Sequence, residues 1–237
     1  MSTLTLAVVY ATLAGATIPL GGLTARVEHF RQRWLEEEFR HGVIAFGGGV
    51  LLAAVALVLV PEGTHHLSPA ASATALALGG VVTMLADRAI ARRGGAGAQL
   101  VALVLDYVPE AMALGAALAT DPALGLLLAV LIALQNYPEG FNAYCELHDG
   151  AGMRPGRALA ALAALVVVGP LAAAIGVMFL QELPTVLGAL MLAAAGGILY
   201  LTFQDIAPQA RLERHWGPPL GAVLGFLVGM VGNQLIG

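Results

Sequence analysis

The chain has 237 residues, of which 59% are hydrophobic and 11% charged, with a formal net charge of −4 and a mean hydropathy of +0.84. A soluble domain is roughly 45–50% apolar and about 25% charged, so this chain has too little polar surface for an ordinary water-soluble fold. The composition instead predicts an all-α integral membrane protein, and the lack of a basic run argues against a nucleic-acid partner.

Eight segments are long and apolar enough to span a bilayer, which requires about 20 mostly apolar residues. The first has no positively charged stretch before it and is interpreted as a span, not a signal peptide. The charged connection at 24–41 is expected to hold a short amphipathic helix. We predict a single transmembrane domain over residues 1–237, with a core of helices at about 99–119 and 122–146. The predicted spans are 4–23, 42–62, 69–91, 99–119, 122–146, 157–180, 184–208 and 217–236.

The arginines predict how the chain crosses the membrane. The sequence contains no lysine, and all eleven of its basic residues fall in alternate loops of the eight-helix arrangement. Cytoplasmic loops retain positive charge, so we expect a multi-pass protein of the cell (inner) membrane with both termini outside the cytoplasm. These residues are Arg26, Arg31, Arg33, Arg40, Arg88, Arg92, Arg93, Arg154, Arg157, Arg211 and Arg214.

The fourth and fifth predicted helices repeat one pattern of polar residues. Residues 106–111 read DYVPEA and residues 135–140 read QNYPEG, so each has a polar side chain, then a proline, then a glutamate. A spacing of four places the two polar side chains on one helix face. The proline removes a backbone N–H and frees a carbonyl. Because the two helices run in opposite directions, we predict an inverted repeat, with a site near the midplane as in many transporters.

Four side chains of this repeat are predicted to bind a divalent cation: Asp106, Glu110, Gln135 and Glu139. A carboxylate at the centre of a bilayer costs at least ~2.5–3.5 kcal/mol, so such residues usually serve function. Oxygen ligands from two helices suit a hard or borderline divalent cation. The structural alternative is a pair of kinks whose carboxyl groups are protonated or bonded to backbone, and the matched spacing on adjacent helices argues against it.

Other polar residues are candidates for the path of the ion. His65 and His66 either collect metal at the outer entrance or form an exposed loop pair. Glu62 and Asp87 lie at helix ends and are interpreted as solvated near the interfaces. A stripe on the fifth helix, joined by Asp205 from the seventh, either forms an exit path or serves packing. The stripe consists of Asn142, Glu146, His148 and Asp149.

At residues 106–111 and 135–140 the sequence resembles the ZIP family of divalent metal transporters, which carries a His-Asn-x-Pro-Glu-Gly type motif in its fourth helix and a related one in its fifth. The glycine-rich second helix and the seventh helix extend the resemblance over nearly the whole chain. It implies import of Zn²⁺, Mn²⁺ or Fe²⁺ toward the cytoplasm by alternating access, without a prosthetic group. Relatives are often dimers, so the resemblance also favours a homodimer.

Departures from the family pattern affect the expected ion. Asp106 stands where the family usually has histidine, as does Gln135 relative to many members. Members with a two-metal centre carry further ligands where this chain has Tyr107, Asn136 and Gly169. The resemblance therefore implies one principal metal site, to which Asn136 is at most a weak additional ligand. Carboxylate and amide oxygens suit manganese, iron(II) or magnesium better than zinc.

The sequence also bears on other functional classes. The sequence has neither a His-Glu-x-x-His helix nor a Gly-x-Ser-x-Gly motif, so we do not expect an enzyme. Buried carboxylates also serve as proton relays, which leaves open a proton- or sodium-coupled cation exchanger. A regulatory relative that has lost transport is the remaining alternative.

Overall fold

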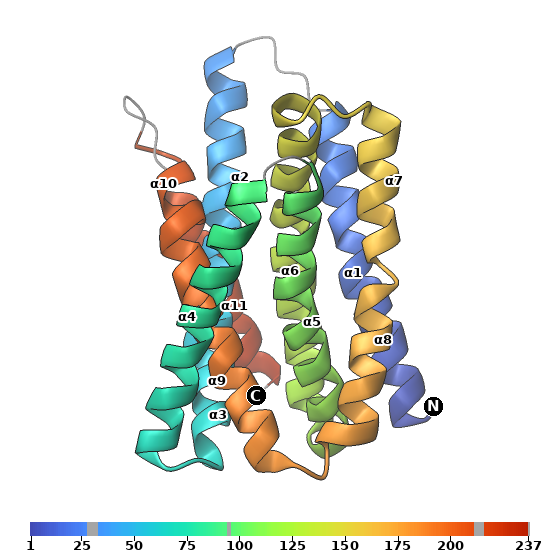
Figure 1. Ribbon diagram of the computed structural model, residues 1–237, viewed down its shortest axis with the longest axis vertical. Coiled ribbons are helices and arrows are strands. Elements are labelled where there is room, and N and C mark those ends of the chain that lie inside the picture. Colours follow the sequence, from blue (N-terminus) through green and yellow to red (C-terminus); the bar gives the residue numbers. More distant parts are fainter. Residues whose placement is uncertain (28–32, 94–95, 211–215, 237) are drawn as a thin grey trace.

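The computed structural model describes residues 1–27, 33–93, 96–210 and 216–236, without the side chains of residues 33–37, 93, 96, 98 and 99. Within these ranges the protein consists of helices and connecting turns, without strands (Figure 1). The predicted all-α class is thereby confirmed for the described part of the chain.

Seven helical stretches in the described ranges are long and apolar enough to cross a membrane, as expected of a multi-pass membrane protein. An eighth apolar helix, α11, has 17 residues. Short π-helical turns interrupt two of the seven and end two others. In chain order the elements are α1 (Thr3–Val27); α2 (Arg33–Ala54), η1 (Val55–Leu59) and α3 (Val60–His65); α4 (Pro69–Arg93); α5 (Ala96–Thr120); α6 (Pro122–Cys145) and η2 (Glu146–Gly150); α7 (Pro155–Leu165), α8 (Val168–Ile175) and η3 (Gly176–Leu180); α9 (Pro184–Leu201), η4 (Thr202–Ile206) and α10 (Ala207–Gln209); and α11 (Leu220–Ile236).

The helix boundaries agree closely with the predicted spans except at α2. This helix begins at Arg33, nine residues before the predicted start of its span, so the described residues of 24–41 belong to α1 and α2 and do not form the separate amphipathic helix that was expected. Both motif prolines, Pro109 and Pro138, lie inside continuous helices. Asp121 caps the start of α6 by accepting hydrogen bonds from the backbone N–H groups of Ala123 at 2.9 Å and Leu124 at 3.2 Å.

Reciprocal glycines bring four helix pairs into backbone contact: α2 with α11, α4 with α9, α1 with α6, and α5 with the α8–η3 stretch. In each pair, an added Cβ on a glycine of either helix would overlap a carbonyl oxygen of the other. Such close contact is how helices associate where lipid supplies no hydrophobic driving force. Between α2 and α11 the contacts are Gly49 with Ala222 and Gly225 with Phe46; between α4 and α9 they are Gly196 with Leu76 and Gly79 with Ala193.

The helices form two groups. We define the motif group as α1, α5, α6, α7 and α8, and the flanking group as α2, α3, α4, α9 and α11; packing within each is more extensive than between them. Side chains tie α1 to the two motif helices. Tyr107 Oη donates to the Ala11 carbonyl at 2.6 Å, Asn136 Nδ2 donates to the Ala14 carbonyl at 3.1 Å, and Tyr137 Oη donates to Thr24 Oγ1 at 2.8 Å.

The last residues of α1, α4, η2 and α10 lie at one end of the bundle, which we call the arginine end (Figure 1). The other connections lie at the opposite end, toward which α1 begins and α11 finishes. Among the described side chains, Arg26, Arg40, Arg88, Arg92, Arg154 and Arg157 belong to the arginine end. Arg31, Arg211, Arg214 and His215 lie outside the described residues, as do the side chains of Arg33 and Arg93.

Candidate cation site

Glu110 of α5 and Gln135 of α6 meet in the core of the bundle. Gln135 Nε2 donates a hydrogen bond to Glu110 Oε1, and the two residues are 4% and 0% exposed. Glu110 Oε2 and Gln135 Oε1 have no hydrogen-bond partner among the described residues. A buried acceptor without a donor is destabilising, so these two oxygens are available to a cation or to water.

Asp106 and Glu139 form a second pair beside the first. Each lies one helical turn from a member of the first pair, and their carboxyl groups lie within reach of one another. A carboxylate is only an acceptor when ionised, so this contact requires a proton or a cation between the two groups. Glu110 is close enough to both for their charges to interact.

The structure therefore brings together all four residues of the predicted site, but as two pairs instead of one cage. Within the described ranges, no group of three or more His, Cys, Asp or Glu side chains is placed so that it holds a metal ion as it stands. The four residues nevertheless supply three carboxyl groups and one amide oxygen at the contact of α5 and α6. Drawing them around one ion requires a rearrangement of side chains.

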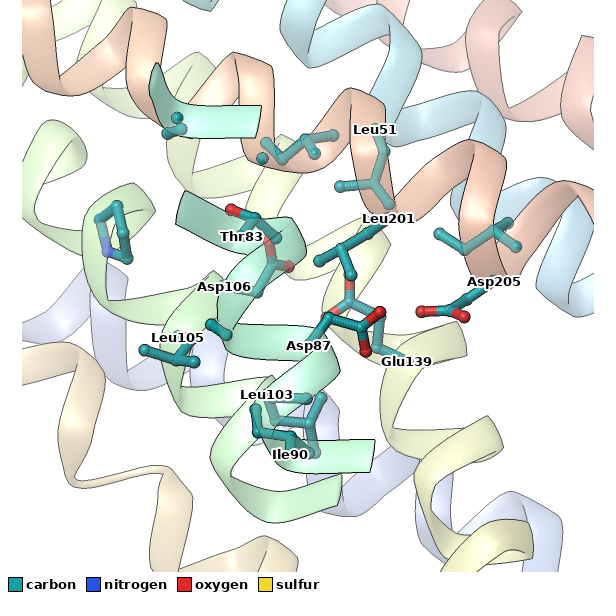
Figure 2. Close-up of a pocket in the computed structure, with 18 of the residues that line it drawn as sticks. Leu51, Thr83, Asp87, Ile90, Leu103, Leu105, Asp106, Glu139, Leu201 and Asp205 are labelled. Atoms are coloured by element: carbon teal, nitrogen blue, oxygen red, sulfur yellow. The ribbon is translucent and has the colours of Figure 1, made fainter. Parts of the chain in front are cut away.

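A cavity of about 630 Å³ leads from the Asp106–Glu139 pair toward the arginine end, between α2, α4, α5, α6 and α9 (Figure 2). Glu110 and Gln135 are not among its described lining residues, so they lie deeper than the cavity floor. Its polar lining residues are Thr83, Asp87, Asp106, Glu139, Asn142, Glu146, Asp205 and Gln209.

Three further carboxylates, Asp87, Glu146 and Asp205, line the cavity nearer the arginine end, and we call them the outer carboxylates. Tyr200 Oη donates to Asp87 Oδ2 at 2.9 Å, and Asn142 Nδ2 donates to Glu146 Oε1 at 3.0 Å. The charge of Asp205 interacts with both other carboxylates. None of the described lining residues is basic, so the cavity is a region of negative potential that concentrates cations.

The predicted exit stripe is present in part. Asn142, Glu146 and Asp205 line the cavity, whereas His148 and Asp149 are not among its described lining residues. His148 Nδ1 lies 2.8 Å from the Met153 carbonyl, and Asp149 lies 3.7 Å from Arg40. The stripe therefore ends at Glu146, and His148 and Asp149 make contacts at the end of the helix instead.

Sequence reasoning missed Asp87 as a cavity residue. Its position near the end of α4, beside Arg88, indicates a solvated interface residue and did not reveal that Asp87 lines the cavity and accepts a hydrogen bond from Tyr200. A signal was present in the sequence. Thr83 and Asp87 are separated by four residues and therefore share one face of an otherwise apolar stretch.

Tyr107, Asn136 and Gly169, which stand where two-metal ZIP members carry further ligands, make other contacts in this structure. The Tyr107 hydroxyl is directed at α1, where it bonds the Ala11 carbonyl, and it fills the space beside Gly169, where an added Cβ would overlap it. Asn136 uses its Nδ2 on the Ala14 carbonyl, and its Oδ1 has no partner among the described residues. Only Asn136 thus retains an oxygen for a cation.

His65 and His66 lie far from the four residues of the predicted site, which we call the central residues. Both are exposed at the opposite end of the bundle, with ring centroids 6.1 Å apart. His66 and Glu62 line a small pocket of about 90 Å³ together with Thr120 and Gln181. This pocket shares none of its lining residues with the large cavity, so the histidine pair belongs to a separate surface.

No protein-family model matches this chain, and no curated protein matches it either. The resemblance of the two motifs to the ZIP family therefore stays a prediction from the sequence.

Proposed function

We propose that this protein carries a divalent cation across a membrane, through a site formed by Asp106, Glu110, Gln135 and Glu139. The observation that carries the proposal is the meeting of three carboxyl groups and one amide in the helical core, at the inner end of a cavity lined by further carboxylates. Uncompensated, such charges repel one another and lose their hydration. A divalent cation as cargo offsets both penalties.

The donor set fits an oxygen-preferring ion. The unpartnered Glu110 Oε2 and Gln135 Oε1 supply one half of a coordination shell, and the Asp106–Glu139 pair supplies the other when the ion replaces the proton between them. Mn²⁺, Fe²⁺ and Mg²⁺ favour such ligands, whereas selective zinc sites use imidazole or thiolate. Zinc stays among the proposed cargoes because of the ZIP resemblance, and Tyr107 supports a mainly single-ion site.

The proposed topology has eight spans, with α11 as the last and both chain termini outside the cytoplasm. The 17 residues of α11 reach the lower limit of a span, about 17–25 residues. The arrangement is supported by the ends of α1, α4, η2 and α10, which lie together at the arginine end, because the segments that follow them in the sequence carry the arginines. The cavity then faces the cytoplasm.

Internal correspondences support an inverted repeat that extends beyond the two motif helices. The π-turn η1 lies between Gly49 and Pro61, and η4 lies between Gly196 and Pro208. In both cases the proline follows the glycine by twelve residues. The reciprocal glycine contacts match as well, since α11 packs on α2 as α4 packs on α9. Repeat-built carriers place the site between their halves and expose it alternately.

The cavity lies between the two helix groups, with α5 and α6 on one side and α2, α4 and α9 on the other. Displacement of the motif group relative to the flanking group would close this cavity and open a path at the opposite end. The hydrogen bonds from Tyr107, Asn136 and Tyr137 to α1 would make α1 move with α5 and α6.

A second candidate is a proton-coupled exchanger. It is favoured by the closeness of the Asp106 and Glu139 carboxyl groups, since a shared proton would satisfy such a contact as well as a cation does. The two candidates differ in what the isolated protein binds and in what moves without metal.

Proteoliposomes loaded with a metal-sensitive dye test the proposal. We expect saturable uptake of Mn²⁺, Fe²⁺ or Zn²⁺ by the intact protein and its loss in a Glu110→Gln/Glu139→Gln double variant that is still folded. Proton flux in the absence of any divalent metal, without metal uptake, would favour the exchanger. If neither flux occurs, the transport proposal is wrong.

A further inference from the structure

The large cavity has two chemically different sides. One is aliphatic and is built chiefly from Leu78, Val82, Ile90, Leu103, Leu105 and Leu190. The other carries the Asp106–Glu139 pair and the outer carboxylates; in Figure 2, Asp87, Asp205 and Glu139 are gathered away from Leu103, Leu105 and Ile90. Among the described lining residues, none is aromatic and none is basic.

The size of the cavity exceeds what a metal ion needs. Its volume is about 630 Å³, whereas a water molecule occupies roughly 30 Å³. Pockets for drug-sized organic ligands measure roughly 300–1,000 Å³ and combine mostly apolar walls with a few polar groups that fix orientation. The cavity has both properties, and its charged groups are all carboxyl groups, which favour positive charge.

We propose that this cavity binds a bulky lipophilic monocation, a molecule with an apolar body and one positive charge. The body lies against the aliphatic side formed by α4, α5 and α9, and the charge lies among the carboxylates on the other side. An anion of the same shape is repelled. This ligand class goes beyond the proposed metal cargo, and its binding does not require that the protein transport metal.

The place of this ligand predicts its effect on an ion at the central site. Asp106 and Glu139 form the inner end of the cavity, and the cavity continues from them to the arginine end. A bound organic cation therefore blocks the path between that end and the central residues. It acts as an inhibitor of any ion flux through the site.

Tetraphenylphosphonium and tetraphenylborate provide a matched pair of probes, since they share shape and size and differ in the sign of the charge. Binding is measured by isothermal titration to the purified full-length protein in a non-ionic detergent, without divalent metal. We expect one saturable site for the phosphonium and at least about tenfold weaker binding of the borate. Equal affinity for both ions, or partitioning without saturation, would overturn the proposal.

A second pair of variants locates the site. Ala86 lines the cavity, while its neighbour Leu85 is 54% exposed and is not among the described lining residues. We expect Ala86→Trp to fill the cavity and abolish phosphonium binding, and Leu85→Trp to leave it unchanged. Asp205→Asn keeps the volume of the side chain and should weaken binding severalfold. Phosphonium binding that survives both Ala86→Trp and Asp205→Asn would place the ligand elsewhere and refute the assignment.

The outcome is separable from that of the proposed function. Phosphonium binding in the cavity stands even if proteoliposomes take up no metal. Phosphonium binding is measured without metal and therefore tests the cavity proposal by itself. Only the competition of Mn²⁺ with the phosphonium requires a metal ion beside Asp106 and Glu139, so that experiment addresses the proposed cation site.

Discussion

The central residues and the outer carboxylates carry the same chemistry in different surroundings. Glu110 and Gln135 are almost fully buried and leave oxygens without a partner in the described structure, whereas Asp87, Glu146 and Asp205 are only partly buried along a cavity. Water can replace a lost oxygen in the cavity and cannot do so in the core. The contribution of a carboxylate to ion binding should therefore decrease from the core toward the arginine end.

The largest expected effect is at Glu110 and Glu139. Glu110→Gln keeps the side-chain volume and removes the charge of a buried carboxyl group, and Glu139→Gln does the same at the inner end of the cavity, so uptake at subsaturating metal should fall roughly a hundredfold, equivalent to about 2.7 kcal/mol. Gln135→Ala removes a neutral ligand and should reduce uptake less. Proteoliposome uptake measures all three, and Glu182→Ala is the control because Glu182 is exposed at the opposite end. Uptake by Glu110→Gln within twofold of the unmodified protein would mean that the core pair holds no ion.

A change of ion preference should follow from Asp106→His. The substitution exchanges a carboxylate for an imidazole, which favours a borderline metal such as zinc over a hard ion. We expect the ratio of zinc to manganese uptake to rise about tenfold. Both uptakes are compared in the two proteins under the same conditions. An unaltered ratio would exclude Asp106 as a ligand and would remove the outer half of the proposed site.

A smaller effect, on rate alone, is expected at the outer carboxylates. Glu146→Gln combined with Asp205→Asn removes two carboxylates from the path by which the ion leaves the central site, so maximal uptake should fall severalfold while the metal concentration at half-maximal uptake, set on the opposite side, stays nearly constant. Asp149→Asn is the matched control, because Asp149 lies in the same π-turn as Glu146 but faces Arg40. Equal uptake by the double variant and the control would assign these residues to solvation.

The proposed topology can be tested at two exposed positions in a Cys145→Ser background. Ser68 lies at the opposite end of the bundle and Gly156 lies at the arginine end. We expect Ser68→Cys to react with an impermeant maleimide from outside the cell and Gly156→Cys only after the membrane is permeabilised. Labelling of both from the same side would contradict the alternation on which the orientation of the cavity depends.

The sequence predicted the long apolar helices well because long apolar runs bounded by proline or glycine leave few alternatives to a helix. The start of α2 was missed because residues 33–41 are charged, and a helix that leaves the membrane no longer needs an apolar face. The π-turns also escaped prediction. They arise from the packing of one helix against others, which the pattern within a single helix does not encode.

The central residues were identified by spacing, but their pairing was not. Spacing of four places Asp106 with Glu110 on one face and Gln135 with Glu139 on another, without specifying which side chain of α5 meets which of α6. The contacts Glu110–Gln135 and Asp106–Glu139 depend on the relative placement of the two helices. Asp87 was misjudged for a related reason, since a carboxylate near a helix end is indistinguishable from a solvated one until its neighbours are known.

The smallest expected effect on transport is at Tyr107, and it separates a structural hydroxyl from a ligand. Tyr107→Phe removes a buried hydrogen bond to the Ala11 carbonyl without changing the ring. We expect the protein to lose about 1 kcal/mol of stability, seen as a melting temperature a few degrees lower, with uptake within twofold of normal. Tyr137→Phe removes a partly buried hydrogen bond to Thr24, which lies on α1 as Ala11 does, and should reduce the stability of the protein less. If Tyr107→Phe instead reduced uptake as far as Glu110→Gln does, its hydroxyl would belong to the cation site. The ion would then have a third group of ligands, on the side of the site that faces α1, besides the core and the cavity residues.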